Sequence, residues 1–173
     1  VIATVLSVQL GNSEASYFSF QLWQWFTLAK QSEIGIAFYF DALTAVMTLV
    51  VTGVGFLIHL FAAFYMRNDT NFTRFMAYMN LFIVAMLLLV LADNLVLLYL
   101  GWEGVGLCSF LLIGFWYQDR ANVLAARKAF IVTRVGDTLM AIGLFMLFDS
   151  LGQLNIQQLL VAADQQWQVG SEM

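Results

Sequence analysis

Four stretches of this chain are apolar over roughly the 20 residues that a helix needs to cross a bilayer. They span residues 41–66, 75–92, 95–117 and 122–148. Of the 173 residues, 62% are hydrophobic and only 10% are charged, whereas a soluble domain carries roughly 25% charged residues. The sequence therefore predicts an all-α polytopic membrane protein built around a transmembrane helix bundle.

The remaining segments predict structure at the ends of this bundle. Residues 1–10 are apolar without a charged flank, which indicates the end of a truncated transmembrane helix. Within residues 11–40, apolar side chains alternate with polar ones on both sides of a polar turn, which predicts a short β-hairpin in an extracytoplasmic loop. Residues 149–173 predict a second extracytoplasmic loop, containing an amphipathic helix with Asn155 as its N-cap.

The basic residues predict which ends of the helices face the cytoplasm. Arg67 and Arg74 flank the first connection between the helices, and Arg120, Arg127 and Lys128 surround the third. Cytoplasmic loops carry an excess of Lys and Arg, so both connections are expected in the cytoplasm. The hairpin, the second connection and the C-terminal segment are then expected on the opposite side.

Several classes of partner and cofactor are not expected for this chain. With seven Lys and Arg residues and no extended basic cluster, the sequence does not predict a nucleic-acid ligand. One cysteine and one histidine are too few for a Cys-ligated iron–sulfur cluster or a bis-His haem. The chain is therefore expected to hold no metal or cofactor, and any redox chemistry is assigned to partner subunits.

Glu103 interrupts the third apolar stretch near its middle. Insertion of an acidic residue there costs about 2.5–3.5 kcal/mol, and such residues usually mark an ion or proton path. Without a fixed counter-charge, this carboxyl group is expected to bind and release protons near neutral pH. The alternative is a protonated glutamate that only links helices. The residues that share its helix face at 100° per residue are Tyr99, Gly106, Phe110 and Gly114.

Arg134 and Asp137 form a second charged group, in the fourth apolar stretch. Their i,i+3 spacing allows them to pair on one helix face. Arg134 is expected about two turns from the cytoplasmic end, with Asp137 deeper. The pair is either a structural ion pair or a tunable one that biases a neighbouring proton site. Arg127 and Lys128 are expected to reach toward the membrane surface.

His59 ends a polar stripe along the first apolar stretch. A lone histidine is a suitable proton relay, because its charge changes near neutral pH. The alternative is a packing surface, since threonine and glycine stripes commonly bring membrane helices together. The stripe consists of Asp41, Thr44, Thr48, Thr52, Gly55 and His59. Outside it, we interpret Asp93 and Asn94 as helix caps and Cys108 as an inert small residue.

Two long motifs carry a resemblance to a known family. The segments "LLYLGWEGVGLCSFLLIGFWY" and "ARKAFIVTRVGDTLMAIGLFMLF" resemble the antiporter-like subunits of respiratory complex I. The likeness is closest to the subunit L group of bacterial NADH-quinone oxidoreductases, the counterpart of the fifth mitochondrially encoded chain. It extends over residues 35–160.

The resemblance implies a proton-translocating subunit of the membrane arm. Electron transfer from NADH to quinone would take place in partner subunits, which hold FMN and iron–sulfur clusters. Glu103 would be the proton carrier, with Arg134 and Asp137 as a coupling ion pair and His59 as a possible relay. In the family, the key glutamate pairs with a lysine on a later helix. That lysine lies outside this sequence, so an N-terminal fragment is expected.

The resemblance also implies partners and a location. The partners would be other membrane-arm subunits, especially a neighbouring antiporter-like subunit, and the lipid bilayer. The location would be the bacterial inner membrane, or the mitochondrial inner membrane for a counterpart. Two alternatives stay open: the large subunit of a multi-subunit Na⁺/H⁺ antiporter, and a non-transporting structural subunit of the membrane arm.

Overall fold

The computed structural model describes residues 17–27 and 33–166, so the helix end predicted at 1–10 lies outside the described residues. Four of the helices are long and apolar enough to cross a membrane, which together with a two-stranded sheet confirms the predicted fold class. The elements are β1 (Tyr17–Thr27), β2 (Glu33–Asp41), α2 (Ala42–Tyr65), α3 (Phe72–Val90), α4 (Leu95–Ile113), α5 (Arg120–Leu151) and α6 (Ile156–Gln166).

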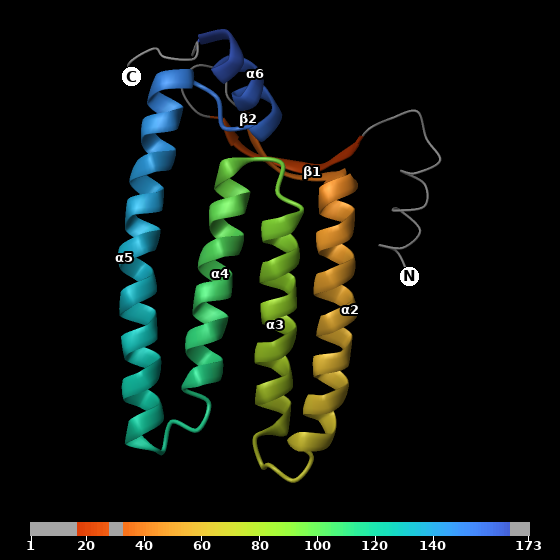
Figure 1. The fold of residues 1–173 in the computed structure, drawn as a ribbon, viewed down its shortest axis with the longest axis vertical. Helices are drawn as coiled ribbons and strands as arrows, with labels where there is room; N and C mark the ends of the chain where they lie inside the picture. The colour runs from red at the N-terminus through yellow and green to blue at the C-terminus, as the bar shows by residue number, and fades with distance from the viewer. Residues whose placement is uncertain (1–16, 28–32, 167–173) are drawn as a thin grey trace.

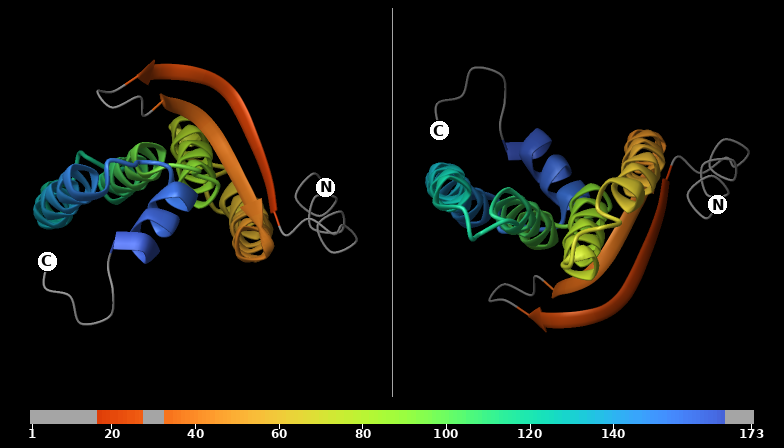
Figure 2. Two further views of the ribbon diagram at one scale, coloured as in Figure 1. Left: turned by 90° about the horizontal axis from the view of Figure 1, so that it is seen from above. Right: turned by 90° about the horizontal axis from the view of Figure 1, so that it is seen from below.

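Helices α2 to α5 stand side by side in a row that follows their order in the chain (Figures 1 and 2). Each packs mainly against its neighbours in the sequence. Large apolar side chains on the row are therefore left uncovered by the described part of the chain, including Phe56 on α2 and Phe145 on α5. Such exposure suits a membrane, because lipid tails are as apolar as these side chains.

The two ends of the row differ in what they carry. The α2–α3 and α4–α5 connections lie at one end, whereas the hairpin, the α3–α4 turn and α6 lie at the other (Figure 1). The basic connections thus share one end, as the alternation of helices predicted. That this end faces the cytoplasm stays a prediction.

The hairpin is antiparallel, with Tyr17 opposite Asp41, and its register shifts between Gln21 and Trp23 and again before residue 26. Residues 17–25 of β1 are all exposed, so the alternation seen in the sequence is not matched by alternating burial. One reason is that β2 is the strand that packs against α2. Its backbone bonds to the α3–α4 turn, where the Tyr39 N–H donates to a carbonyl oxygen at 2.9 Å.

The α3–α4 turn joins the hairpin to the start of α6. Asn94 is the N-cap of α4, as predicted: its Oδ1 accepts from the Leu97 N–H at 2.9 Å. Its Nδ2 donates to the Gly35 carbonyl oxygen at 3.0 Å. The cap interpretation of Asp93 was wrong, because its carboxylate accepts from Asn155 Nδ2 at 2.5 Å instead. Asn155 in turn caps α6, accepting from two backbone N–H groups of its first turn.

The stability of the protein should depend on the charge of Asp93. Burial raises the pKa of its carboxyl group, and the hydrogen bond from Asn155 opposes this shift. The folded protein thus binds this proton more tightly than the unfolded chain, so ionising Asp93 costs stability as pH rises through the folded pKa. We expect Asp93→Asn to raise the melting temperature of the detergent-purified protein at pH 7. The gain should vanish below about pH 4, where the acid is protonated in both states.

Asp164→Asn is the matched control, since this acid on α6 is exposed and its loss changes the net charge equally. It should leave the melting temperature unchanged at both pH values. A gain for Asp93→Asn that persists in acid would show that burial of the charge is not its cause.

The ends of α4 and α5 differ from those expected. Helix α4 ends at Ile113, four residues early, with Gly114 as its C-cap. Helix α5 begins at Arg120, because the Asp119 side chain accepts from a backbone N–H of its first turn at 2.9 Å. Arg134 is about four turns into α5, so the expected depth of two turns was wrong; the earlier start of the helix accounts for only about half a turn of the difference.

Candidate functional site

A cluster of three charged side chains lies between α4 and α5. Arg134 Nη1 forms an ion pair with Glu103 Oε2 and lies 3.8 Å from Asp137 Oδ2. Arg134 and Asp137 thus lie near each other, as expected. The closer ion pair of Arg134, however, is with Glu103 and joins α5 to α4. Glu103 lies close to the middle of the 19-residue α4, so the cluster sits at about mid-depth in the row.

The charges of this cluster do not balance. Asp137 is 7% exposed, Glu103 21% and Arg134 32%. Arg134 supplies Glu103 with a counter-charge from the same chain, so the carboxyl group is not without an ionic partner. Two carboxylates nevertheless share one guanidinium, which leaves one excess negative charge when both acids are ionised. An uncompensated charge away from water is expensive.

The predicted face of α4 around Glu103 does contact α5. The Tyr99 hydroxyl lies 3.4 Å from a backbone carbonyl oxygen of α5. The Phe110 ring centroid is 5.1 Å from that of a phenylalanine on α5. A Cβ placed on Gly106 or Gly114 would lie 4.0 Å or 3.2 Å from α5 side chains. The contact with α5 is tight at Gly114, whereas a Cβ on Gly106 would fit in ordinary van der Waals contact.

Trp102 is a member of the site that we did not predict. Its indole Nε1 donates to Asp137 Oδ1 at 2.7 Å, across the same helix pair. Trp102 precedes Glu103 on α4, yet its side chain contacts the other acid. The available signal was chemical, because a tryptophan N–H far from the ends of an apolar helix requires an acceptor.

His59 is not part of this cluster. Helix α2 packs against α3 and β2, whereas the cluster lies between α4 and α5. His59 Nδ1 is 2.7 Å from the Gly55 carbonyl oxygen, so this nitrogen carries the hydrogen. Its Nε2 is buried and without a partner among the described residues. A relay through His59 therefore needs groups beyond the part of the chain described.

The polar stripe of α2 lies in a helix contact. Thr44, Thr48 and Gly55 are buried. A Cβ added to Gly55 would lie 2.6 Å from the Ile83 side chain of α3. The Thr52 hydroxyl donates to the Thr48 carbonyl oxygen, within its own helix. These contacts support the packing interpretation of the stripe.

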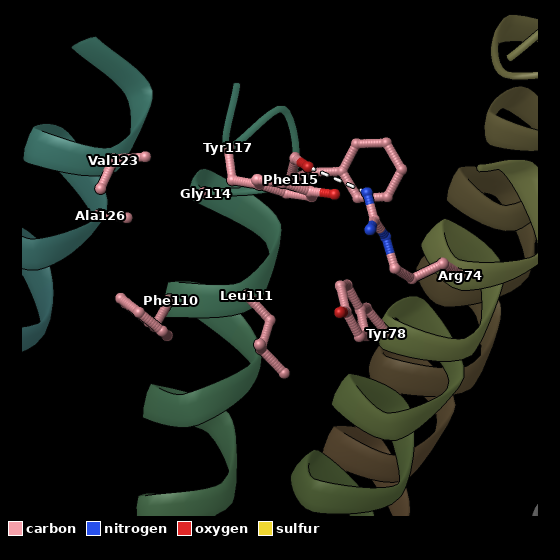
Figure 3. Close-up of a pocket in the computed structure, with 9 residues that line it drawn as sticks. All are labelled: Arg74, Tyr78, Phe110, Leu111, Gly114, Phe115, Tyr117, Val123 and Ala126. Carbon is pink, nitrogen blue, oxygen red and sulfur yellow. Dashed lines mark hydrogen bonds between the residues drawn. The ribbon is translucent and has the colours of Figure 1, made fainter. Parts of the chain in front are cut away.

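A cavity of about 220 Å³ lies beside a second arginine, Arg74. It is lined by residues of α3, α4 and α5 near the α4–α5 connection. Arg74 reaches across it from α3, as Figure 3 shows, and donates to the Phe115 carbonyl oxygen at 3.2 Å. Its guanidinium also lies over the rings of Phe115 and Tyr117, at 4.8 and 5.1 Å. A cation here satisfies a free carbonyl just beyond the C-terminus of α4, which is a structural role.

Within residues 17–27 and 33–166, no group of three His, Cys, Asp or Glu side chains is placed to hold a metal ion. Cys108 is fully buried and unpaired to another cysteine. The Glu103–Arg134–Asp137 cluster is the group of charged side chains that these residues bring together across two helices.

Two family models match this sequence. The model described as "NADH-Ubiquinone oxidoreductase (complex I), chain 5 N-terminus" matches residues 25–76. The model described as "NADH:quinone oxidoreductase/Mrp antiporter, TM" matches residues 92–173 and so includes the whole charged cluster.

Curated relatives agree over nearly the full sequence. NADH-quinone oxidoreductase subunit L of Pseudomonas aeruginosa is 56% identical over 96% of this chain and 27% of its own length. The Escherichia coli protein of the same name is 52% identical over 94% of this chain and 26% of its own length. That of Mycobacterium tuberculosis is 49% identical over 71% of this chain. The chain thus spans about a quarter of the length of the first two relatives.

Proposed function

The chain belongs to the subunit L family of NADH-quinone oxidoreductases, the antiporter-like membrane subunits of complex I, and on this premise we propose that it translocates protons. The observation that carries the proposal is the ion pair of Glu103 with Arg134 beside Asp137, at mid-depth between two membrane helices. Ionisable groups at this depth mark ion and proton paths by default.

In this proposal Glu103 is the proton carrier. Its carboxyl group alternates between a protonated form and an ionised form paired with Arg134. Asp137 is a second acid close to the same guanidinium. Proton uptake at Glu103 therefore changes the electrostatic environment of Asp137. The cluster can therefore couple a proton on α4 to charge on α5.

The redox part of the reaction belongs to partners. NADH oxidation and quinone reduction would occur in other subunits, which would hold the FMN and iron–sulfur clusters. The neighbours would be membrane-arm subunits, among them a second antiporter-like subunit, within the bacterial inner membrane. The basic end of the row would face the cytoplasm, in line with the excess of positive charge there.

The test replaces Glu103 with glutamine in the full-length subunit within its complex. Glutamine keeps the shape but holds no exchangeable charge. Proton transfer through this subunit should slow by about a hundredfold or more, because a positioned acid–base group contributes roughly 10²–10⁴-fold. The measurement is the ratio of protons translocated to NADH oxidised in inverted membrane vesicles. Asp149→Asn, an exposed acid near the end of α5, is the control.

The same experiment separates the alternatives. A structural subunit predicts that Glu103→Gln changes the amount of assembled complex but leaves translocation per complex intact. A Na⁺/H⁺ antiporter predicts sodium-dependent transport without NADH oxidation. A normal proton-to-NADH ratio in assembled Glu103→Gln complexes would refute the carrier role.

A further inference from the structure

Trp102 and Arg134 approach Asp137 from different sides. The indole Nε1 donates to Oδ1 at 2.7 Å, and the guanidinium lies 3.8 Å from Oδ2. Each oxygen of the buried carboxyl group thus faces its own donor. Glu103, by contrast, forms its ion pair with Arg134 and has no tryptophan donor of this kind among the described residues.

This difference decides where a shared proton resides. With two acids and one guanidinium, the first proton goes to the acid whose ionised form is less well stabilised. An indole N–H can donate a hydrogen bond but cannot accept one. It therefore stabilises an ionised carboxylate and cannot accept a hydrogen bond from the O–H of a carboxylic acid. Within residues 17–27 and 33–166, the charged and titratable groups around Asp137 are Glu103 and Tyr99 from α4 and Arg134 from its own helix.

An analogous bond lies outside the membrane-spanning helices. Trp116 Nε1 donates to Asp69 Oδ2 at 3.0 Å. The pKa of Asp69 is lowered, first by the backbone N–H of Asn71 and next by this indole. At Asp69, too, an indole N–H donates to an aspartate carboxylate and adds to the stabilisation of its ionised form.

We infer that Trp102 is a positioning residue: it holds Asp137 as the ionised partner in the cluster, so that the exchangeable proton resides on Glu103. The inference rests on the proposed function of Glu103. On proton uptake, an O–H bond forms on the Glu103 carboxyl group, its ion pair with Arg134 is lost, and the guanidinium is left to Asp137. On release, that O–H bond breaks and the ion pair of Glu103 with Arg134 forms again.

The first test is Trp102→Phe, which removes the N–H and keeps an aromatic ring. Asp137 then competes with Glu103 for the proton, so translocation per NADH should fall. The pH dependence of translocation should move up by about one pH unit, since the lost hydrogen bond is to a charged group. Both are measured in vesicles that contain the complete complex with the full-length subunit.

Trp116→Phe is the matched control, because it removes the other tryptophan–aspartate bond. The two tryptophans are almost equally exposed, Trp102 at 47% and Trp116 at 48%. The Trp116 variant should keep the wild-type ratio and pH profile. If Trp102→Phe behaves in the same way as Trp116→Phe, the inference is overturned.

Asp137→Asn gives a second test that leaves Trp102 and its packing in place. Asparagine resembles a protonated aspartate, so the profile should move to lower pH if Asp137 is normally ionised, because Glu103 then has Arg134 to itself. An unchanged profile would mean that Asp137 already carries the proton, against the inference. This result is informative even if the Trp102 variant does not assemble.

The double variant Trp102→Phe with Asp137→Asn completes the cycle. If Trp102 acts through Asp137, the double variant should match Asp137→Asn alone, whereas a packing role would give additive losses. Glu103→Gln keeps the two proposals apart. Normal translocation in that variant refutes the proposed function, and loss of translocation there with a silent Trp102→Phe refutes only the inference.

Discussion

Replacing Arg134 with glutamine is expected to abolish proton translocation through this subunit and to reduce the amount of assembled complex. Glu103 and Asp137 would lose their shared cation, and Glu103 its ion pair. An unpaired acid at the centre of a membrane helix costs about 2.5–3.5 kcal/mol, so both groups would take up protons and keep them. Assembly is measured by native gel electrophoresis of solubilised membranes, and translocation by the proton-to-NADH ratio.

Two further variants separate charge from shape. Arg134→Lys keeps the charge but not the planar fork, and should restore assembly more fully than translocation. Combining Arg134→Gln with Glu103→Gln and Asp137→Asn removes all three charges, and should restore assembly with no translocation. Wild-type assembly and translocation in Arg134→Gln would contradict a role for this cation at the site.

Replacing Gly101 with alanine is expected to disrupt the contact of α3 with α4. A Cβ at this position would lie 2.5 Å from the backbone nitrogen of Leu89 and 2.7 Å from its Cα. Backbone atoms cannot move aside by changing a rotamer, so the cost should reach the upper end of the roughly 1–3 kcal/mol typical of overpacking. The measurement is the melting temperature of the detergent-purified protein together with the yield of complex.

Gly53→Ala is the control for this substitution. Gly53 lies within α2, and a Cβ there would meet no atom within 4 Å. Alanine is also the better helix former, by about 1 kcal/mol in water-exposed helices. Gly53→Ala should therefore be neutral or slightly stabilising. A similar drop in melting temperature in both variants would mean that replacing any helix glycine is harmful, and that the close contact of Gly101 is not the cause.

Local features of the fold could be predicted from single residues. A long apolar run has one way to satisfy its backbone in lipid, so the helices followed from length alone. Asn94 and Asn155 were recognisable as caps because a cap depends on the next few residues only. Asp93 was misinterpreted for the opposite reason, since its partner lies 62 positions further along the chain.

The contacts within the charged cluster could be predicted from the sequence only in part. Helix periodicity placed Glu103 on a face with small and aromatic residues, and that face does contact α5. The meeting of Glu103 with Arg134 depends on how α4 and α5 align along their axes, and α5 begins at 120 instead of 122, a shift of only about half a turn. The hydrogen bond of Trp102 depends on the rotation of both helices, which no local pattern encodes.

The arrangement of α4 and α5 has a consequence for how the chain enters the bilayer. Each helix carries charge that is costly to insert alone, whereas their ion pair offsets part of that cost once they lie together. Only the short stretch 114–119 separates them, so they can cross as one hairpin. Insertion would then select for the correct pairing of the two helices, because a pairing that separates Glu103 from Arg134 leaves both charges facing lipid.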